Sequence, residues 1–501
     1  MPAHSVPPLK APTGRVHEAS AQASAQAPAE GVEPLGLPML SREADASPER
    51  ANASATARHP RYRLAFTVPW IGKAFPSWFP YFVASAARSA YIADWLIFHE
   101  GTVLETSVFI PPNVLLHDLG RGGLGRLFGS KLARAIGPSA SEATLVQLFQ
   151  QAFRDFAYIV TEYKPTHGTV FADFLAHGGY THWSYTDLDM VMGDLPVFIE
   201  REELQDFHLV SYHFGDVFRL YLRGQFTAHQ NTPHVNALWT KCSHLSNGLQ
   251  AELESKHKIV RALAKQGKRG RTRFISAEGC YSAAVASEPG LRVKYAAKAF
   301  ADWSEDKFFY VADGAVRKCI RPEQAWLPGA NGSGACEPFG PRLDLPSAKL
   351  TGVQTPIGEE LPLRIHHNCS RWVQKSFRLC ASLSEKEAPL YNVFLRDGRW
   401  TAQRFVSRAP AGSLEGAFLH LQQWKGRYRK LRYGGASIPL LQGRTTFLLS
   451  PRGFLPVDMT YDDTWGGVMA TGSEVLFDAD RRAYYRPETK GTGEQVPART
   501  G

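Results

Sequence analysis

The segment "YTHWSYTDLDMVMGDLP", Tyr180 to Pro196, combines the apolar pattern of a buried strand with two carboxylates, Asp187 and Asp189. At this spacing a regular strand would point both side chains to one side. Burying two like charges is costly unless a cation joins them. We therefore expect the pair at the carboxyl end of a strand, where ligands of parallel sheets bind, sharing a divalent metal. Carboxylate oxygens suit Mg²⁺ or Mn²⁺.

The residues before this segment predict strands and helices in alternation. Strands are expected over 61–70 and 92–100, with a helix over 79–90 between them. A strand–helix–strand unit of this length predicts an α/β fold with a mostly parallel sheet flanked by helices. The apolar spacing further predicts a weaker strand over 106–112 and helices over 141–160 and 168–177.

The later part of the chain is expected to extend the same catalytic unit. Asp397-Gly398 separates two strand-like runs, which predicts a β-hairpin. The Ala-, Pro- and Ser-rich start predicts a disordered tail over 1–60. We expect the core over 61–340, its C-terminal extension over 341–484 and a flexible end over 485–501.

The composition narrows the class of protein. The 501 residues are 44% hydrophobic, enough for a large core, and the net charge of +10 favours anionic partners. Six cysteines without a CxxC pair argue against a zinc ribbon and leave disulfides open. No apolar run predicts a transmembrane helix, and the start lacks a signal-peptide core. The cytoplasm is therefore favoured, with glycosylation sequons at Asn52, Asn331 and Asn368 keeping the secretory pathway open.

Two features of the sequence allow other interpretations of the protein's function. Asp187, Asp189 and Val191 fit the DxDx(T/V) pattern of haloacid-dehalogenase-type phosphatases, in which the first aspartate is the nucleophile. That fold places the motif near the start of its domain, whereas here several elements precede it. The basic run over 256–273 is a solvated face or an anion-attracting patch. It contains no interleaved aromatic residues for base stacking, so no specific nucleic-acid partner is expected.

Several segments in a fixed order resemble a little-characterised bacterial glycosyltransferase-like family with a GT-A fold and a DxD motif. The first is a strand, a Gly-Lys turn, an aromatic helix and a second strand. The second is a Lys-Pro-x-x-Gly segment, and the third holds the two aspartates. A strand ending in Asn-Thr and a late His-containing segment follow; the five segments span residues 66–98, 163–175, 182–199, 224–239 and 417–425. This chain departs by having Ser184 in place of a glycine and Trp424 in place of a basic residue.

The resemblance implies a GT-A-like sheet and transfer of a sugar from a nucleotide-sugar donor to a hydroxyl acceptor, such as a glycan. It implies that Asp187 and Asp189 bind Mn²⁺ or Mg²⁺ and the donor diphosphate. His420 is the candidate third metal ligand, or else a packing residue. The implied substrate-binding residues are Lys164, Trp183, Tyr185, Asp194 and Asn231.

The catalytic base is expected at Glu278. An inverting transferase needs a carboxylate to deprotonate the acceptor hydroxyl. The family often has an Asp-Glu pair here, whereas this chain has Ala277 before Glu278. The family's acidic pair after the second strand is likewise replaced by His99-Glu100. These departures leave open a protein that binds a carbohydrate or nucleotide without catalysis.

Overall fold

The computed structural model describes the chain in pieces, over 62–76, 78–106, 108–266, 277–302, 309–312, 315–319, 354–367, 379–384, 386–407, 413–422, 446–450, 453–462, 467–471, 476–478 and 483–485. The tail expected over 1–60, most of the flexible end and part of the basic run lie outside these residues. By its contacts, His59–Gly501 forms one compact unit, separate from Met1–Arg58.

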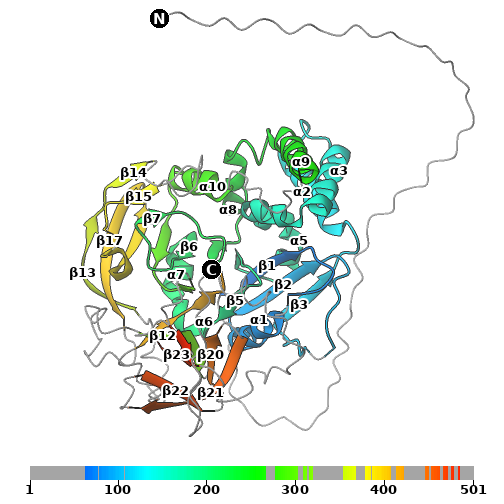
Figure 1. Cartoon of the computed structure of the whole chain (residues 1–501). Helices are drawn as coiled ribbons and strands as arrows, with labels where there is room; N and C mark the ends of the chain where they lie inside the picture. Colours follow the sequence, from blue (N-terminus) through cyan, green and yellow to red (C-terminus); the bar gives the residue numbers. More distant parts are fainter. Residues whose placement is uncertain are drawn as a thin grey trace, which may run out of the picture. The chain divides into compact units, whose positions relative to one another are not determined.

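A ten-stranded mixed sheet forms the centre of the described unit (Figure 1). Its order is β13-β17-β16-β9-β6-β8-β4-β1-β2-β3. The neighbouring strands β4, β1, β2 and β3 are parallel, while β8 runs antiparallel to both β4 and β6. The strands are β1 Leu64–Trp70, β2 Ala93–His99, β3 Val114–Asp118, β4 His182–Tyr185, β6 Leu209–Tyr212, β8 Thr227–Gln230, β9 Val293–Ala296, β13 Gln354–Pro362, β16 Tyr391–Arg396 and β17 Arg399–Ser407.

Helices cover the sheet, and three of them, α2, α3 and α9, lie together at one end in Figure 1. The longer described helices are α1 Phe79–Ala86, α2 Gly123–Ile136, α3 Glu142–Asp155, α9 Leu249–Lys265 and α10 Ala277–Ala286. The shorter ones are α4 His167–Val170, α5 Ala172–His177, α6 Leu195–Phe198, α7 Arg201–Asp206 and α8 Pro233–Asn236. Described 3₁₀ helices are η1 Ala87–Ser89, η2 Ala157–Thr166, η3 Leu238–Lys241 and η6 Ala388–Leu390.

Alternate residues of the central strands face two different hydrophobic clusters. In β2, Leu96 and Phe98 belong to the cluster that includes α2 and α3, whereas Trp95 and Ile97 belong to the cluster that includes α1. All seven residues of β2 are buried. A strand covered on both faces explains the nearly continuous apolar sequence of this segment. The prediction of an α/β protein with a large sheet flanked by helices is confirmed. The expectation that the sheet is mostly parallel is wrong: four of its described strand pairs are parallel and five are antiparallel, because β8 reverses direction and β13, β16 and β17 join as antiparallel strands.

Smaller sheets complete the described part. β5 Met190–Met192, β10 Phe300–Ala301 and β19 Phe418–His420 form one, and β7 Arg219–Leu220, β14 Ile365–His367 and β15 Leu379–Ala381 form another. A six-stranded sheet holds β11 Phe309–Ala312, β12 Ala315–Cys319, β18 Ser413–Gly416, β20 Thr446–Ser450, β21 Gly453–Asp462 and β22 Gly467–Thr471. β23 Leu476–Asp478 pairs with β24 Ala483–Tyr485.

The predicted hairpin is confirmed, and two other predictions need correction. β16 and β17 pair around Asp397-Gly398, whose φ angles of 49° and 74° suit a tight turn. The third strand is Val114–Asp118, not 106–112, because Pro111 and Pro112 cannot donate ladder hydrogen bonds. The helix expected over 168–177 is divided between α4 and α5 at Phe171.

Candidate functional site

The two aspartates follow the carboxyl end of β4. β4 ends at Tyr185, and Asp187 and Asp189 lie in the bend before β5. The expectation that they lie where the chain leaves the sheet is confirmed. The expectation of two side chains on one side of a regular strand is wrong, because the strand ends before either residue.

His420 joins the aspartates from a segment late in the chain. β19 pairs antiparallel with β5, in a register that puts His420 opposite Met190. His420 Nε2 is 3.5 Å from Asp189 Oδ2. One ligand atom from each of Asp187, Asp189 and His420 lies within 4.8 Å of the others, so the group could hold a metal ion. Carboxylate oxygens and an imidazole nitrogen are both common ligands of divalent metal ions in proteins.

Gly193 explains how β19 can approach so closely. Its amide donates to Ala417 O at 2.8 Å. A Cβ atom at Gly193 would lie 2.5 Å from Gly416 O, closer than real Cβ atoms come to other atoms. The glycine that follows "DLDMVM" therefore permits the pairing that brings His420 to the aspartates.

Lys164 connects the aspartates to the loop before β8. Its ammonium group is 2.6 Å from Asp187 Oδ1 and 2.5 Å from Gly224 O. The lysine side chain is 7% exposed and that of Asp187 is 25% exposed. Gln225 Nε2 lies 3.4 Å from the other oxygen of Asp187. Part of the carboxylate charge at the site is thus neutralised by the protein itself.

Glu278, in the first turn of α10, reaches the same loop. A Cβ atom at Gly224 would lie 2.2 Å from Glu278 Oε1 and 3.3 Å from Lys164 Nζ, so the glycine leaves room for the carboxyl group beside the lysine. Burial raises the pKa of Glu278, and the negative charge of Asp187 adds to this rise. The positive charges of Lys164 and Arg223 oppose it. A carboxyl group with a raised pKa is a stronger base once it is ionised.

Glu162 lies close to the start of α10 beside Glu278, and the sequence pattern did not identify it as a site residue. It lies on η2 two residues before Lys164, and its carboxylate accepts the Ala277 N–H at 3.2 Å. Burial is the main cause that raises the pKa of Glu162 to about 7, and Glu278 contributes. A short 3₁₀ helix leaves little periodic signal, so only its closeness to Lys164 in the sequence could have indicated it.

Trp183 and Tyr185, expected to bind substrate, are core residues of β4. Trp183 is fully buried, donates to Asn236 Oδ1 at 2.6 Å and stacks on His229 with ring centroids 3.9 Å apart. Tyr185 is 1% exposed and lies 5.8 Å below the Lys164 ammonium. The structure gives Trp183 a packing role, and Tyr185 supports the lysine from beneath.

Asn231 and Asp194 are not brought to the candidate metal ligands. β8 runs antiparallel to β4 with Gln230 opposite His182, so Asn231 lies at the other edge of the sheet from Asp187. There it donates to Tyr180 O at 2.9 Å and stabilises a turn. Asp194 lies beyond the far end of β5 and precedes α6. The prediction that these residues share one site with the aspartates is not supported by their positions.

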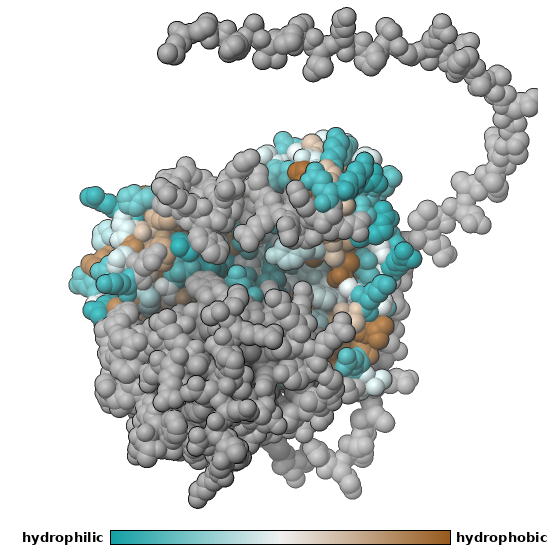
Figure 2. Space-filling model, in the orientation of Figure 1, coloured by the Kyte–Doolittle hydropathy of each residue, from teal (hydrophilic) through white to brown (hydrophobic). Residues whose placement is uncertain are grey.

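One face of the molecule is hollowed. Figure 2 shows a hollow between the part that carries β6 and the part that carries β1 in Figure 1, and the described residues visible in it are mainly hydrophilic. Polar walls suit a charged or hydroxyl-rich ligand.

Residues 143–260 match a family of unknown function (DUF6625). The matched region runs from α3 into α9 and includes Lys164, both aspartates and Gly224, but neither Glu278 nor His420. No curated protein matches the chain. In the described residues, no helix is both long and apolar enough to cross a membrane.

Proposed function

We propose that this protein is a metal-dependent glycosyltransferase that moves a sugar from a nucleotide-sugar to a hydroxyl acceptor. The observation that carries the proposal is the convergence of Asp187, Asp189 and His420 at the carboxyl end of β4. The strand order β3-β2-β1-β4, followed by antiparallel β8, is compatible with the GT-A-like sheet that the sequence resemblance implies.

In this proposal Asp187, Asp189 and His420 hold Mn²⁺ or Mg²⁺, which, when bound, would offset the negative charge that builds on a departing diphosphate. Lys164 fixes the orientation of Asp187 through their 2.6 Å contact. Because the lysine is buried, its charge also acts on nearby anions with little screening by solvent.

Glu278 is the proposed base that accepts the proton of the acceptor hydroxyl. It lies beside Gly224 and Lys164, and Lys164 contacts Asp187, so the base belongs to the same connected group as the metal ligands. Because adjoining elements carry the base and the metal ligands, the acceptor hydroxyl and the departing diphosphate would be held close to each other, which favours reaction.

The test is manganese-dependent release of nucleoside diphosphate from a panel of nucleotide-sugars. The Asp187→Asn/Asp189→Asn double variant should lose at least about 100-fold in kcat while remaining folded, because the site loses both carboxylate charges. Asp206→Asn, an exposed aspartate on α7, is the matched control and should keep full activity. Retained turnover in the double variant would refute the proposal.

The departure at Ala277 favours a second candidate, a protein that binds nucleotide-sugars without turnover. Where the family often has an Asp-Glu pair, this chain has Ala277 and Glu278, so Glu278 is the one carboxylate of the pair. Stabilisation by a nucleotide-sugar with no release of nucleoside diphosphate from any donor would support this candidate. A phospho-aspartate trapped at Asp187 would instead support the phosphatase reading.

A further inference from the structure

The first turn of α10, which carries Glu278, is attached to its surroundings on several sides. The Ala277 N–H donates to Glu162 at 3.2 Å. Ser282 Oγ donates to Glu278 O at 2.5 Å and accepts the Leu222 N–H at 2.9 Å. Through Ser282 the helix is therefore joined to the loop that leads to Gly224.

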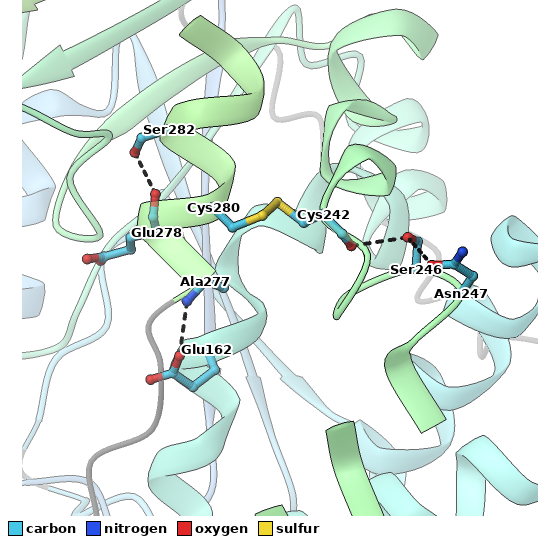
Figure 3. The surroundings of a disulfide bond; sticks show 8 residues. All are labelled: Glu162, Cys242, Ser246, Asn247, Ala277, Glu278, Cys280 and Ser282. Carbon is cyan, nitrogen blue, oxygen red and sulfur yellow. Dashed lines mark hydrogen bonds between the residues drawn. A yellow bond between two sulfur atoms is a disulfide. The ribbon is translucent and has the colours of Figure 1, made fainter. Parts of the chain in front are cut away.

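A disulfide adds a covalent attachment within the same turn. Cys280, two residues after Glu278, is bonded to Cys242, which follows η3, and the two Cα atoms are 5.9 Å apart (Figure 3). Figure 3 shows the disulfide leaving α10 on a different side from the Glu278 side chain. Cys242 is fully buried among core residues, so it provides a fixed point for the helix.

The closeness of Glu278 to Gly224 leaves little tolerance for movement of α10. The carboxyl oxygen occupies the place that a side chain at residue 224 would fill, beside the Lys164 ammonium. A small rotation or shift of the helix would press Glu278 into the Gly224 backbone or withdraw it from the lysine. Shifts of this size matter, because misplacing a reacting group by about 1 Å can cost about 100-fold in rate.

We propose that the Cys242–Cys280 disulfide is a positioning element that holds Glu278 in register with Lys164 and Gly224. This inference rests on the proposed function. It makes catalysis, rather than stability alone, dependent on the oxidised state of this cysteine pair. Reduction or removal of the bond frees α10 to move while leaving Asp187 and Asp189, between β4 and β5, and His420, on β19, in place.

The experiment uses the full chain with Cys242→Ala/Cys280→Ala, which leaves neither a free thiol nor a buried hydroxyl. Cys380 is also disulfide-bonded, so the variant isolates one bond where a reducing agent would not. Leu132→Ala, a truncation of a fully buried core residue in α2, is a destabilised control with the disulfide intact. All proteins are assayed at a temperature at which circular dichroism shows them fully folded.

We expect kcat of the cysteine variant to fall at least about tenfold while KM for the donor and the Mn²⁺ affinity change by less than about twofold, since only the base is displaced. Amide hydrogen exchange of residues 277–286 should become faster in this variant and not in Leu132→Ala. Unchanged kcat with faster exchange would show that the bond only stabilises the helix, and would overturn the inference. Unchanged exchange would overturn it independently of any activity.

A wild-type chain that turns over no donor would instead count against the proposed function. The exchange measurement would then still decide whether the disulfide restrains α10, so the two failures are distinguishable.

Discussion

Removal of Lys164 should lower the stability of the folded chain. The lysine is buried, and its ammonium contacts both the Asp187 carboxylate and Gly224 O. Lys164→Met would leave a partly buried carboxylate and a carbonyl without their donor, at a cost of about 2–3 kcal/mol in the free energy of unfolding. Urea denaturation at neutral pH measures this loss.

Lys131→Met is the matched control for this prediction. Its ion pair with Asp173 is 2.6 Å long, but the aspartate side chain is 63% exposed. Exposed ion pairs contribute at most about 1 kcal/mol. Equal losses in the two variants would mean that burial gives Lys164 no special weight.

Glu162 should make stability depend on pH. Its pKa of about 7 in the folded chain exceeds its ordinary value of 4.5, so the folded state keeps a proton that the unfolded state loses between these values. Stability therefore falls as pH rises through this window. Glu162→Gln should remove the contribution of Glu162 to this fall, making the variant more stable than the wild type at pH 8 by up to about 3 kcal/mol.

Urea denaturation of both proteins at about pH 4.5 and pH 8 checks the sign of this effect. The advantage of Glu162→Gln should be present at pH 8 and absent at the lower pH. An advantage that is equal at the two pH values would contradict it.

Single residues were predictable from the sequence where their chemistry was unusual for their surroundings. Asp187 and Asp189 stood out because carboxylates interrupted an apolar run. Trp183 was wrongly predicted to bind substrate. The sequence next to a motif does not indicate whether an aromatic side chain faces a ligand or the core. Asn231 could not be excluded from the site without knowing that β8 runs antiparallel to β4.

The position of His420, the third candidate metal ligand, depends on the pairing of β5 with β19. Gly193→Ala would put a methyl group about 2.5 Å from Gly416 O, so the strands must separate. We expect Mn²⁺ affinity to fall at least about tenfold, because His420 would move away from the aspartates. Calorimetric titration with Mn²⁺ measures the change.

His420→Ala should lower the affinity by a comparable factor, because it removes the same ligand. Wild-type affinity in Gly193→Ala would show that the close approach of β19 is not needed to hold the metal ligands together.

Long, regular elements were easier to predict than short or irregular ones. The apolar period over 141–160 gave α3, and the alternation around Asp397-Gly398 gave the hairpin. The segment over 106–112 resembled a strand in composition, yet the one beside β2 begins at Val114. Local composition does not contain the pairing partner, and the partner decides which apolar run becomes the strand.

At the scale of the whole molecule, the late part of the chain completes both the sheet and the site. β16, β17 and β13 extend the central sheet, and β19 supplies His420. Contacts of such long sequence separation leave no local signal. The resemblance to a family, not the periodicity of the sequence, pointed to His420.

The Cys242–Cys280 disulfide bears on the compartment of the protein. Disulfides form and persist mainly in oxidising compartments, whereas the sequence alone favoured the cytoplasm. We therefore propose that the protein works in an oxidising compartment. Alkylation of native cell extracts followed by mass spectrometry should find both cysteines protected; two freely alkylated thiols would contradict this proposal.

We propose that Asp187, Asp189 and His420 together hold a divalent cation, which their closeness allows. Calorimetric titration of the purified chain with Mn²⁺ tests it most directly, with Asp187→Asn/Asp189→Asn and the exposed-site control Asp206→Asn in parallel. We expect one saturable site per chain in the wild type and in the control, and none in the double variant. Mn²⁺ binding of equal strength in all three proteins, or in none of them, would contradict it.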